Sequence, residues 1–181
     1  YLFSNAGFAA GMEITIPSRV TLIGAEAFRG ASNLRSVTLP DSLETIGYKA
    51  FAGCDLREIV IPENVINVYG SVFNGNKNLH KVEIKSTKIE HSNDRLNNYV
   101  FGNCSIDEII FNDEMTYIPN YLFSNAGVVS GTQVIIPDKV SLIGGAAFSG
   151  ITKIVSVTLP LGIDTIKADA FKNCTGINEV I

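Results

Sequence analysis

The chain contains a long internal repeat. Residues 1–54 and 121–174 align without a gap at an offset of 120, and 27 of the 54 aligned positions are identical. The segment from Tyr1 to Gly7 recurs unchanged from Tyr121 to Gly127. Fixed periods in a sequence are the mark of stacked repeat architectures. The repeat therefore predicts a solenoid-like array of similar units.

A shorter repeat of about 23 residues runs inside the long one. Its most regular feature is a phenylalanine in each unit, with successive spacings of 25, 23, 22, 28, 22, 25 and 23 residues. The first five spacings make up the 120-residue period, so the long repeat consists of five short ones. We therefore predict a single array of about seven units across 1–181, cut from a longer array. The phenylalanines that count the units are Phe3, Phe28, Phe51, Phe73, Phe101, Phe123, Phe148 and Phe171.

Each unit contains a strand, a stop and a turn. The segment 36–39 alternates polar and apolar residues, which is strand periodicity. Pro40 ends this strand because proline has no N–H to give to a ladder. A second, shorter extended stretch is predicted at 45–47, and Ala50-Phe51 is predicted in a 3₁₀ or short helical turn. Because each unit has one apolar side, we expect stacking to bury it, with each phenylalanine ring on the next.

These features together resemble the BspA-like leucine-rich repeats of bacterial surface proteins. The family pattern reads L-x-x-V-x-I-P-x-x-V-x-x-I-G-x-x-A-F-x-x-C, and residues 34–54 match it at nearly every marked position. The resemblance implies a leucine-rich-repeat solenoid that is mostly β. In this fold a parallel sheet forms the concave face, and short strands and 3₁₀ or short helical turns lie on the other side. It also implies an extracellular or cell-surface location in a host-associated bacterium.

The chain departs from the family pattern at a few positions. The fourth unit is about five residues longer than its neighbours and has Lys85 in place of the proline, and the fifth has Asn112 there. Gly11 and Gly131 replace the leading leucine. Leucine-rich repeats in general carry Asn or Cys after the strand. Here only Asn64 lies near that position, so we expect the usual asparagine ladder to be missing.

Composition and motifs exclude several classes of function. The net charge is −4, so the chain has no basic field for nucleic acid or anionic lipid. No apolar run approaches the roughly 20 residues that span a bilayer, and we expect no membrane insertion. Phosphate-binding loops, nucleophile elbows and H-E-x-x-H motifs are absent from the sequence. The adjacent acids of Asp107-Glu108 point to opposite faces of a strand. We therefore predict no enzyme activity and no cofactor.

The cysteines and histidines are predicted to be structural or exposed. Cys54, Cys104 and Cys174 each follow a repeat phenylalanine by three residues, two or three units apart. Stacked strands lie about 4.8 Å apart, whereas a disulfide needs Cα atoms within about 7 Å. We therefore predict small buried side chains without a disulfide or a metal site. His80 and His91 have no second ligand in register, and we predict that both lie on the surface.

The outward face of the strands is the first candidate for binding. An exposed apolar strip on such a face suits a protein partner, and the alternative is that β-branched residues simply favour strands. By alternation, one column carries Glu13, Ser36, Glu58, Lys81, Glu108, Gln133, Ser156 and Glu179, and a second carries Thr15, Thr38, Val60, Glu83, Ile110, Ile135 and Thr158. The predicted contact residues are Val60, Glu83, Ile110, Ile135, Glu58, Lys81 and Glu108.

A polar, Asn-rich insert at 88–99 is the second candidate. Insertions in solenoids map to loops on one face, often the binding face. The alternative is a spacer that resets the stack between long repeats. The predicted loop residues are His91, Asn93, Asp94, Arg95, Asn97 and Asn98.

The sequence therefore favours a non-catalytic protein-binding module. The partner implied by the resemblance is a host matrix protein or a bacterial surface protein, with adhesion as the activity. A second hypothesis is an architectural spacer that presents another domain and binds nothing itself.

Overall fold

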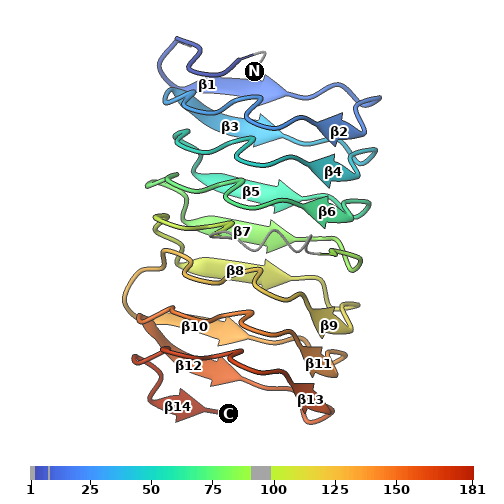
Figure 1. The fold of residues 1–181 in the computed structure, drawn as a ribbon, viewed down its shortest axis with the longest axis vertical. Helices are drawn as coiled ribbons and strands as arrows, with labels where there is room; N and C mark the ends of the chain where they lie inside the picture. The colour runs from blue at the N-terminus through green and yellow to red at the C-terminus, as the bar shows by residue number, and fades with distance from the viewer. Residues whose placement is uncertain (1–2, 8, 91–98) are drawn as a thin grey trace.

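The computed structural model describes residues 3–7, 9–90 and 99–181, and it shows a stack of parallel strands (Figure 1). Most turns of the stack contribute one long strand and, a few residues after that strand ends, one short strand. The long strands are β1 (Met12–Thr15), β3 (Leu34–Thr38), β5 (Glu58–Ile61), β7 (Lys81–Ile84), β8 (Glu108–Phe111), β10 (Thr132–Ile135), β12 (Ile154–Thr158) and β14 (Glu179–Val180). The short strands are β2 (Leu22–Ile23), β4 (Thr45–Ile46), β6 (Asn67–Val68), β9 (Tyr117–Ile118), β11 (Leu142–Ile143) and β13 (Thr165–Ile166). This arrangement confirms the predicted parallel solenoid.

Turns rather than 3₁₀ or α-helices carry the phenylalanines in the described part of the chain. Around Phe51, the N–H of Ala50 donates to the carbonyl of Gly47 and the N–H of Ala52 donates to the carbonyl of Lys49, both at 3.1 Å. Lys49 has a φ of 54°, in the left-handed region. A left-handed residue interrupts a right-handed helical run, which is why the turn does not extend into a helix.

The phenylalanines form one continuous stack, as the sequence predicts. From Phe3 to Phe171, neighbouring ring centroids lie 5.1–5.8 Å apart, and the ring planes are within 5–14° of parallel. At these distances the rings are in the range of favourable aromatic contact. Five consecutive rings, from Phe51 to Phe148, are fully buried. The hydrophobic core therefore runs without interruption along the turn side of the stack.

In four of the turns, the residue three positions after the phenylalanine ties its turn to the one before. The Cys54 thiol donates to the carbonyl of Phe28 at 3.2 Å. At the equivalent position, the buried amide of Asn76 donates to the carbonyl of Phe51 at 2.8 Å and accepts the N–H of Leu56 at 3.1 Å. Equivalent thiol bonds join Cys104 to Phe73 and Cys174 to Phe148. Cys or Asn thus bonds to the preceding turn at four of these positions, whereas Ala6, Ala31, Ala126 and Ile151 occupy the other four.

The ladder of long strands falls into three sections: β1 with β3, β5 with β7 and β8, and β10 with β12 and β14. Between β3 and β5, two backbone bonds continue across the boundary, including one from the Asp55 N–H to the Leu34 carbonyl at 3.1 Å. Between β8 and β10, no strand pairing is present among the described residues. The ladder of long strands is therefore interrupted between β8 and β10, whereas the phenylalanine stack on the turn side continues past this point.

A longer connection explains the interruption. Phe123 and Pro137 are 14 residues apart, whereas Phe51 and Pro62 are 11 apart. The extra chain runs beside Ile106, whose N–H donates to the carbonyl of Gly127 at 3.0 Å. A Cβ at position 127 would collide with the neighbouring backbone, so the close approach requires glycine. This segment occupies the edge beside the start of β8 and holds β10 away from it.

Candidate interaction surface

The two predicted columns lie in register on the long strands. Glu58 pairs with Lys81 and Lys81 with Glu108, while Val60 pairs with Glu83 and Glu83 with Ile110. In the neighbouring section, Ile135 pairs with Thr158. The alternation read from the sequence is therefore correct, and these residues share one face, which we call the long-strand face. Their role in binding stays a prediction.

The charged column of the long-strand face partly neutralises itself. The Lys81 ammonium lies 3.2 Å from the Glu108 carboxylate, with side chains 32% and 52% exposed. In the second column, Glu83 lies 3.9 Å from the ammonium of Lys85. Exposed ion pairs of this kind contribute at most about 1 kcal/mol. These ion pairs therefore contribute little to the stability of the fold.

The apolar residues of the second column lie in the middle of the array. Val60 is 37% exposed and Ile135 is 63% exposed, while Ile110 is half-buried. Glu83 separates Val60 from Ile110. Threonines occupy this column in the outer strands β1, β3 and β12. We call Val60, Ile110 and Ile135 the apolar strip.

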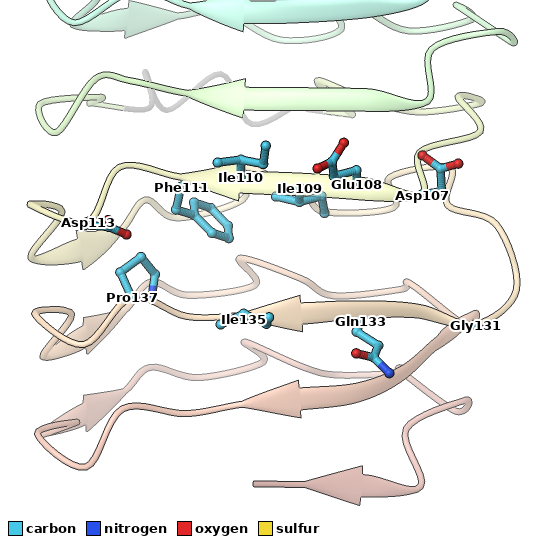
Figure 2. A pocket seen from close by; sticks show the side chains of 10 residues that line it. All are labelled: Asp107, Glu108, Ile109, Ile110, Phe111, Asp113, Gly131, Gln133, Ile135 and Pro137. Atoms are coloured by element: carbon cyan, nitrogen blue, oxygen red, sulfur yellow. The ribbon is translucent and has the colours of Figure 1, made fainter.

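A groove of about 550 Å³ lies between β8 and β10, where the strand ladder is interrupted (Figure 2). Ile109 is half-buried there, although the equivalent Val82 in β7 is fully buried. Figure 2 shows Ile109 and the Phe111 ring directed into the space between the two strands. The lining residues are Asp107, Glu108, Ile109, Ile110, Phe111, Asp113, Gly131, Gln133, Ile135 and Pro137.

Sequence reasoning did not predict this groove. It placed Ile110 and Ile135 in one continuous column, but the two residues lie on opposite sides of the groove. The sequence feature that could have indicated the groove is the 14-residue spacing from Phe123 to Pro137, which is longer than in the regular units. That spacing also occurs from Phe3 to Pro17, in the other copy of the long repeat.

The predicted loop residues of the insert lie outside the described residues. These are His91, Asn93, Asp94, Arg95, Asn97 and Asn98. The chain just before them is anchored, because the Glu90 N–H donates to the carbonyl of Ile66 at 2.7 Å. The hydroxyl of Tyr117 donates to the carbonyl of Ile89 at 3.0 Å. The binding role of the insert stays a prediction.

The thiols and the described histidine do not assemble a reactive site. Burial raises the pKa of the Cys54 and Cys104 thiols from an ordinary value of 9.0 to about 12, and it raises that of Cys174 as well. All three thiols are free. His80 is exposed and lies 3.8 Å from the Asp107 carboxylate. Within residues 3–7, 9–90 and 99–181, no three His, Cys, Asp or Glu side chains are grouped to hold a metal ion.

Nor does the described part of the chain contain a helix of the length and apolarity needed to cross a bilayer.

Comparison with known proteins gives a family and a fold. The family model "BspA type Leucine rich repeat region" matches residues 1–129 and 75–181, with six copies of the repeat. No relative was found among curated protein sequences.

Several solved structures share the fold. A leucine-rich repeat protein of T. pallidum is 24% identical, with a TM-score of 0.57, and the match covers 94% of this chain and 69% of that one. A leucine-rich cell surface protein of Faecalibacterium prausnitzii is 21% identical, with a TM-score of 0.52 and coverages of 93% and 59%. A leucine-rich repeat protein of Bacteroides ovatus is 27% identical, with a TM-score of 0.50 and coverages of 93% and 54%. This chain thus spans little more than half the length of the latter two.

Proposed function

Since the chain belongs to the BspA-type leucine-rich repeat family of bacterial surface proteins, we propose that it is a non-catalytic protein-binding module. Its location is extracellular, on the cell surface or secreted, and its partner is a host matrix protein or another bacterial surface protein. The cell-surface description of the F. prausnitzii protein supports this location. Adhesion is the activity that such a module would serve.

The apolar strip is the observation that carries the proposal. Val60 and Ile135 are large apolar side chains exposed on the long-strand face, where threonine occupies the same column in β1, β3 and β12. Exposed apolar side chains gathered on one face mark protein contact sites more often than scattered ones do. The neighbouring Glu58, Lys81 and Glu108 supply a charged border that can orient a partner.

An architectural spacer is the second candidate, and the phenylalanine stack favours it. Seven ring-to-ring steps of 5.1–5.8 Å join every turn to the next through a buried core. Repeat arrays held together in this way act as extended scaffolds. In this case the long-strand face would contact nothing, and the apolar strip would reflect only the preference of β-branched residues for strands.

Substitutions in one column separate the two candidates. The first variant changes Val60, Ile110 and Ile135 to lysine, and the matched control changes Thr15, Thr38 and Thr158 to lysine in the same column. Both variants add three positive charges at strand positions. Binding is measured to immobilised fibronectin, laminin and collagen and to intact bacterial cells. We expect the strip variant to lose at least about tenfold in affinity, which corresponds to about 1.4 kcal/mol, with the control close to wild type. Equal binding by all three proteins would favour the spacer.

A further inference from the structure

We propose that the phenylalanine turns bind an acidic oligosaccharide, one built from uronic acid units. The site is a shallow groove of about 730 Å³ that crosses several turns, and we call it the turn groove. None of its lining residues belongs to a long strand, so the inference does not depend on the apolar strip. The lining residues that carry the argument are Asn5, Arg29, Tyr48, Lys49, Asn74 and Tyr99.

The floor of the turn groove is backbone. Gly30, Gly53 and Gly75 lie two residues after successive phenylalanines and have φ values of 69–81°. The N–H group of each donates to a carbonyl of the next turn at 2.8 Å. Because glycine has no side chain, these positions leave the space above the backbone open from one turn to the next. The groove volume lies within the usual range for ligand sites, roughly 300–1,000 Å³.

Tyr48 offers an aromatic surface in the turn groove. It is 36% exposed, and the residues at the same position of the neighbouring turns, three before the phenylalanine, are the small Ala25 and Gly70. The Lys49 ammonium lies 4.9 Å from the centroid of the Tyr48 ring, in a cation–π contact. An exposed ring beside polar groups suits a sugar, whose C–H groups pack on the ring while its hydroxyls bond to the polar groups.

The turn groove is positively charged, although the chain carries a net charge of −4. Arg29 and Lys49 line it, and neither aspartate nor glutamate is among its lining residues. The Arg29 guanidinium donates to the Glu26 carboxylate at 3.2 Å, and its side chain is 50% exposed. A guanidinium carries five N–H groups, of which this bond uses one, and it binds carboxylates through pairs of parallel hydrogen bonds. The charges therefore favour a ligand that carries carboxylates.

The remaining polar groups favour a sugar over a peptide. Asn5 and Asn74 contribute side-chain amides from the first and fourth turns, and Tyr99 contributes a phenol from the fifth. Amides and hydroxyls both donate and accept, as the hydroxyls of a sugar require. Ala52 is the only aliphatic side chain among the lining residues. The groove therefore offers little to the apolar side chains of a peptide.

The second copy of the long repeat lacks the two cations and the ring. Its residues at these places are Ser149, Ala168 and Asp169, in the order of Arg29, Tyr48 and Lys49. Lys172 replaces the small alanine of the floor, and its ammonium lies 3.3 Å from the Asp169 carboxylate. Lys49 and Asp169 share a left-handed conformation, with φ values of 54° and 62°. The same backbone thus accepts both sets of side chains, so the second copy supplies substitutions that the fold tolerates.

NMR titration of the whole, isotope-labelled chain tests the ligand. The probes are tetragalacturonate, a hyaluronan tetrasaccharide and the fully methyl-esterified tetragalacturonate, which lacks the charges. We expect the uronates to bind at least about tenfold more tightly than the ester and to shift the amides of Gly30, Gly53 and Gly75 most. The two uronates distinguish a plant polymer from an animal matrix as the source, and binding of either supports the proposal. Failure of both at millimolar concentration, or equal binding of the ester, would overturn it.

Transplanting residues of the second copy locates the site. The test variant carries Arg29→Ser, Tyr48→Ala and Lys49→Asp. The control carries Arg19→Ser and Lys153→Asp, which change the net charge by the same amount at exposed positions outside the groove. We expect at least about a tenfold loss of affinity for the uronates in the test variant alone. Equal losses in both variants would show that only the net charge matters and would overturn the turn groove as the site.

Single substitutions at Tyr48 separate sugar stacking from charge attraction. Tyr48→Phe keeps the ring and Tyr48→Ala removes it, while both leave Arg29 and Lys49 in place. We expect Tyr48→Phe to bind tetragalacturonate like wild type and Tyr48→Ala to bind it at least about fivefold more weakly. Hexaglutamate, which carries carboxylates without a sugar, should bind more weakly and be insensitive to Tyr48→Ala. Tighter binding of hexaglutamate, or equal binding of tetragalacturonate by both variants, would identify a site for acidic peptides and overturn the proposal.

Discussion

The regular section formed by β5, β7 and β8 and the junction between β8 and β10 are built from the same repeat, but they differ on one side only. In the regular section, four successive residues of each strand pair with the next strand. At the junction that pairing is lost in the described part of the chain. The phenylalanine rings nevertheless stack across the junction, with centroids of Phe101 and Phe123 5.1 Å apart. The stacked phenylalanines therefore hold the array together at the point where the long strands do not pair.

Truncating a stacked phenylalanine should have the largest effect in both regions. Phe51 lies beside the regular section and Phe123 at the junction, and both side chains are fully buried. We expect Phe51→Ala and Phe123→Ala each to lower the free energy of unfolding by about 3–5 kcal/mol, as large core truncations do. Urea unfolding followed by circular dichroism measures the change. Wild-type-like urea unfolding of either variant would contradict a stack that is continuous through the junction.

The Asn76 position should show the next largest effect, and it distinguishes the two regions. Asn76 bonds two carbonyls and one N–H beside the regular section, whereas the equivalent residue at the junction is Ala126. We expect Asn76→Ala to cost about 2–3 kcal/mol, because buried backbone groups lose their partners. Asn76→Cys should recover part of this loss, since cysteine fills the same position in other turns. Chemical unfolding of both variants gives the comparison, and equal stability of the two would contradict the role of the side-chain bonds.

The fold was more predictable than the groove. The phenylalanine spacing gave the stack because every turn must place one ring over the last, and Pro40 and its equivalents marked the strand ends. The register of the columns followed from simple alternation in each strand. The loss of strand pairing between β8 and β10 could not be predicted from alternation, because alternation within one strand does not show whether the next strand lies close enough to pair. The 14-residue spacing before Pro137 was visible, but its effect depends on where the extra chain packs, beside Ile106.

The conformation of the phenylalanine turns and the side-chain bonds between them were also not predictable from the sequence. A 3₁₀ turn at Ala50-Phe51 was a reasonable expectation from its length, but Lys49 adopts a left-handed conformation that no residue preference of lysine predicts. The sequence predicts no asparagine ladder after the strand, where leucine-rich repeats usually carry one. Side-chain bonds between turns occur instead in some of the phenylalanine turns, where Cys54 and Asn76 occupy equivalent positions.

The thiols give a pH-dependent test that should not differ between the regions. Cys54 lies beside the regular section and Cys104 just before β8, and burial raises the pKa of both to about 12. At pH 8 both should react slowly with a thiol reagent until the protein unfolds. The unfolded chain loses thiol protons near pH 9 that the folded chain retains. The free energy of unfolding should therefore fall as the pH rises from about 9 toward 12. Rapid labelling of Cys104 alone would show that the junction is open on its turn side as well.

Shortening the connection should convert the junction into a regular section. Deleting Val129 and Ser130 reduces the spacing from Phe123 to Pro137 from 14 residues to 12, the value found between Phe28 and Pro40. We expect β10 to pair with β8 and amide exchange at Gln133 and Ile135 to slow by at least about tenfold. The effect on the free energy of unfolding should be small, because the new strand pairing offsets the loss of the bond from the Val129 N–H to Ile106. Unchanged exchange at both amides would show that the spacing does not cause the interruption.

Removing an ion pair from the long-strand face should have the smallest effect. Lys81 and Glu108 lie 3.2 Å apart on β7 and β8, and both side chains are accessible to water. Because water screens exposed charges, we expect Lys81→Ala to change the free energy of unfolding by less than about 1 kcal/mol. Urea unfolding of the variant measures the change. A large loss of stability would mean that strand-side charges, and not only the phenylalanine stack, hold the regular section together.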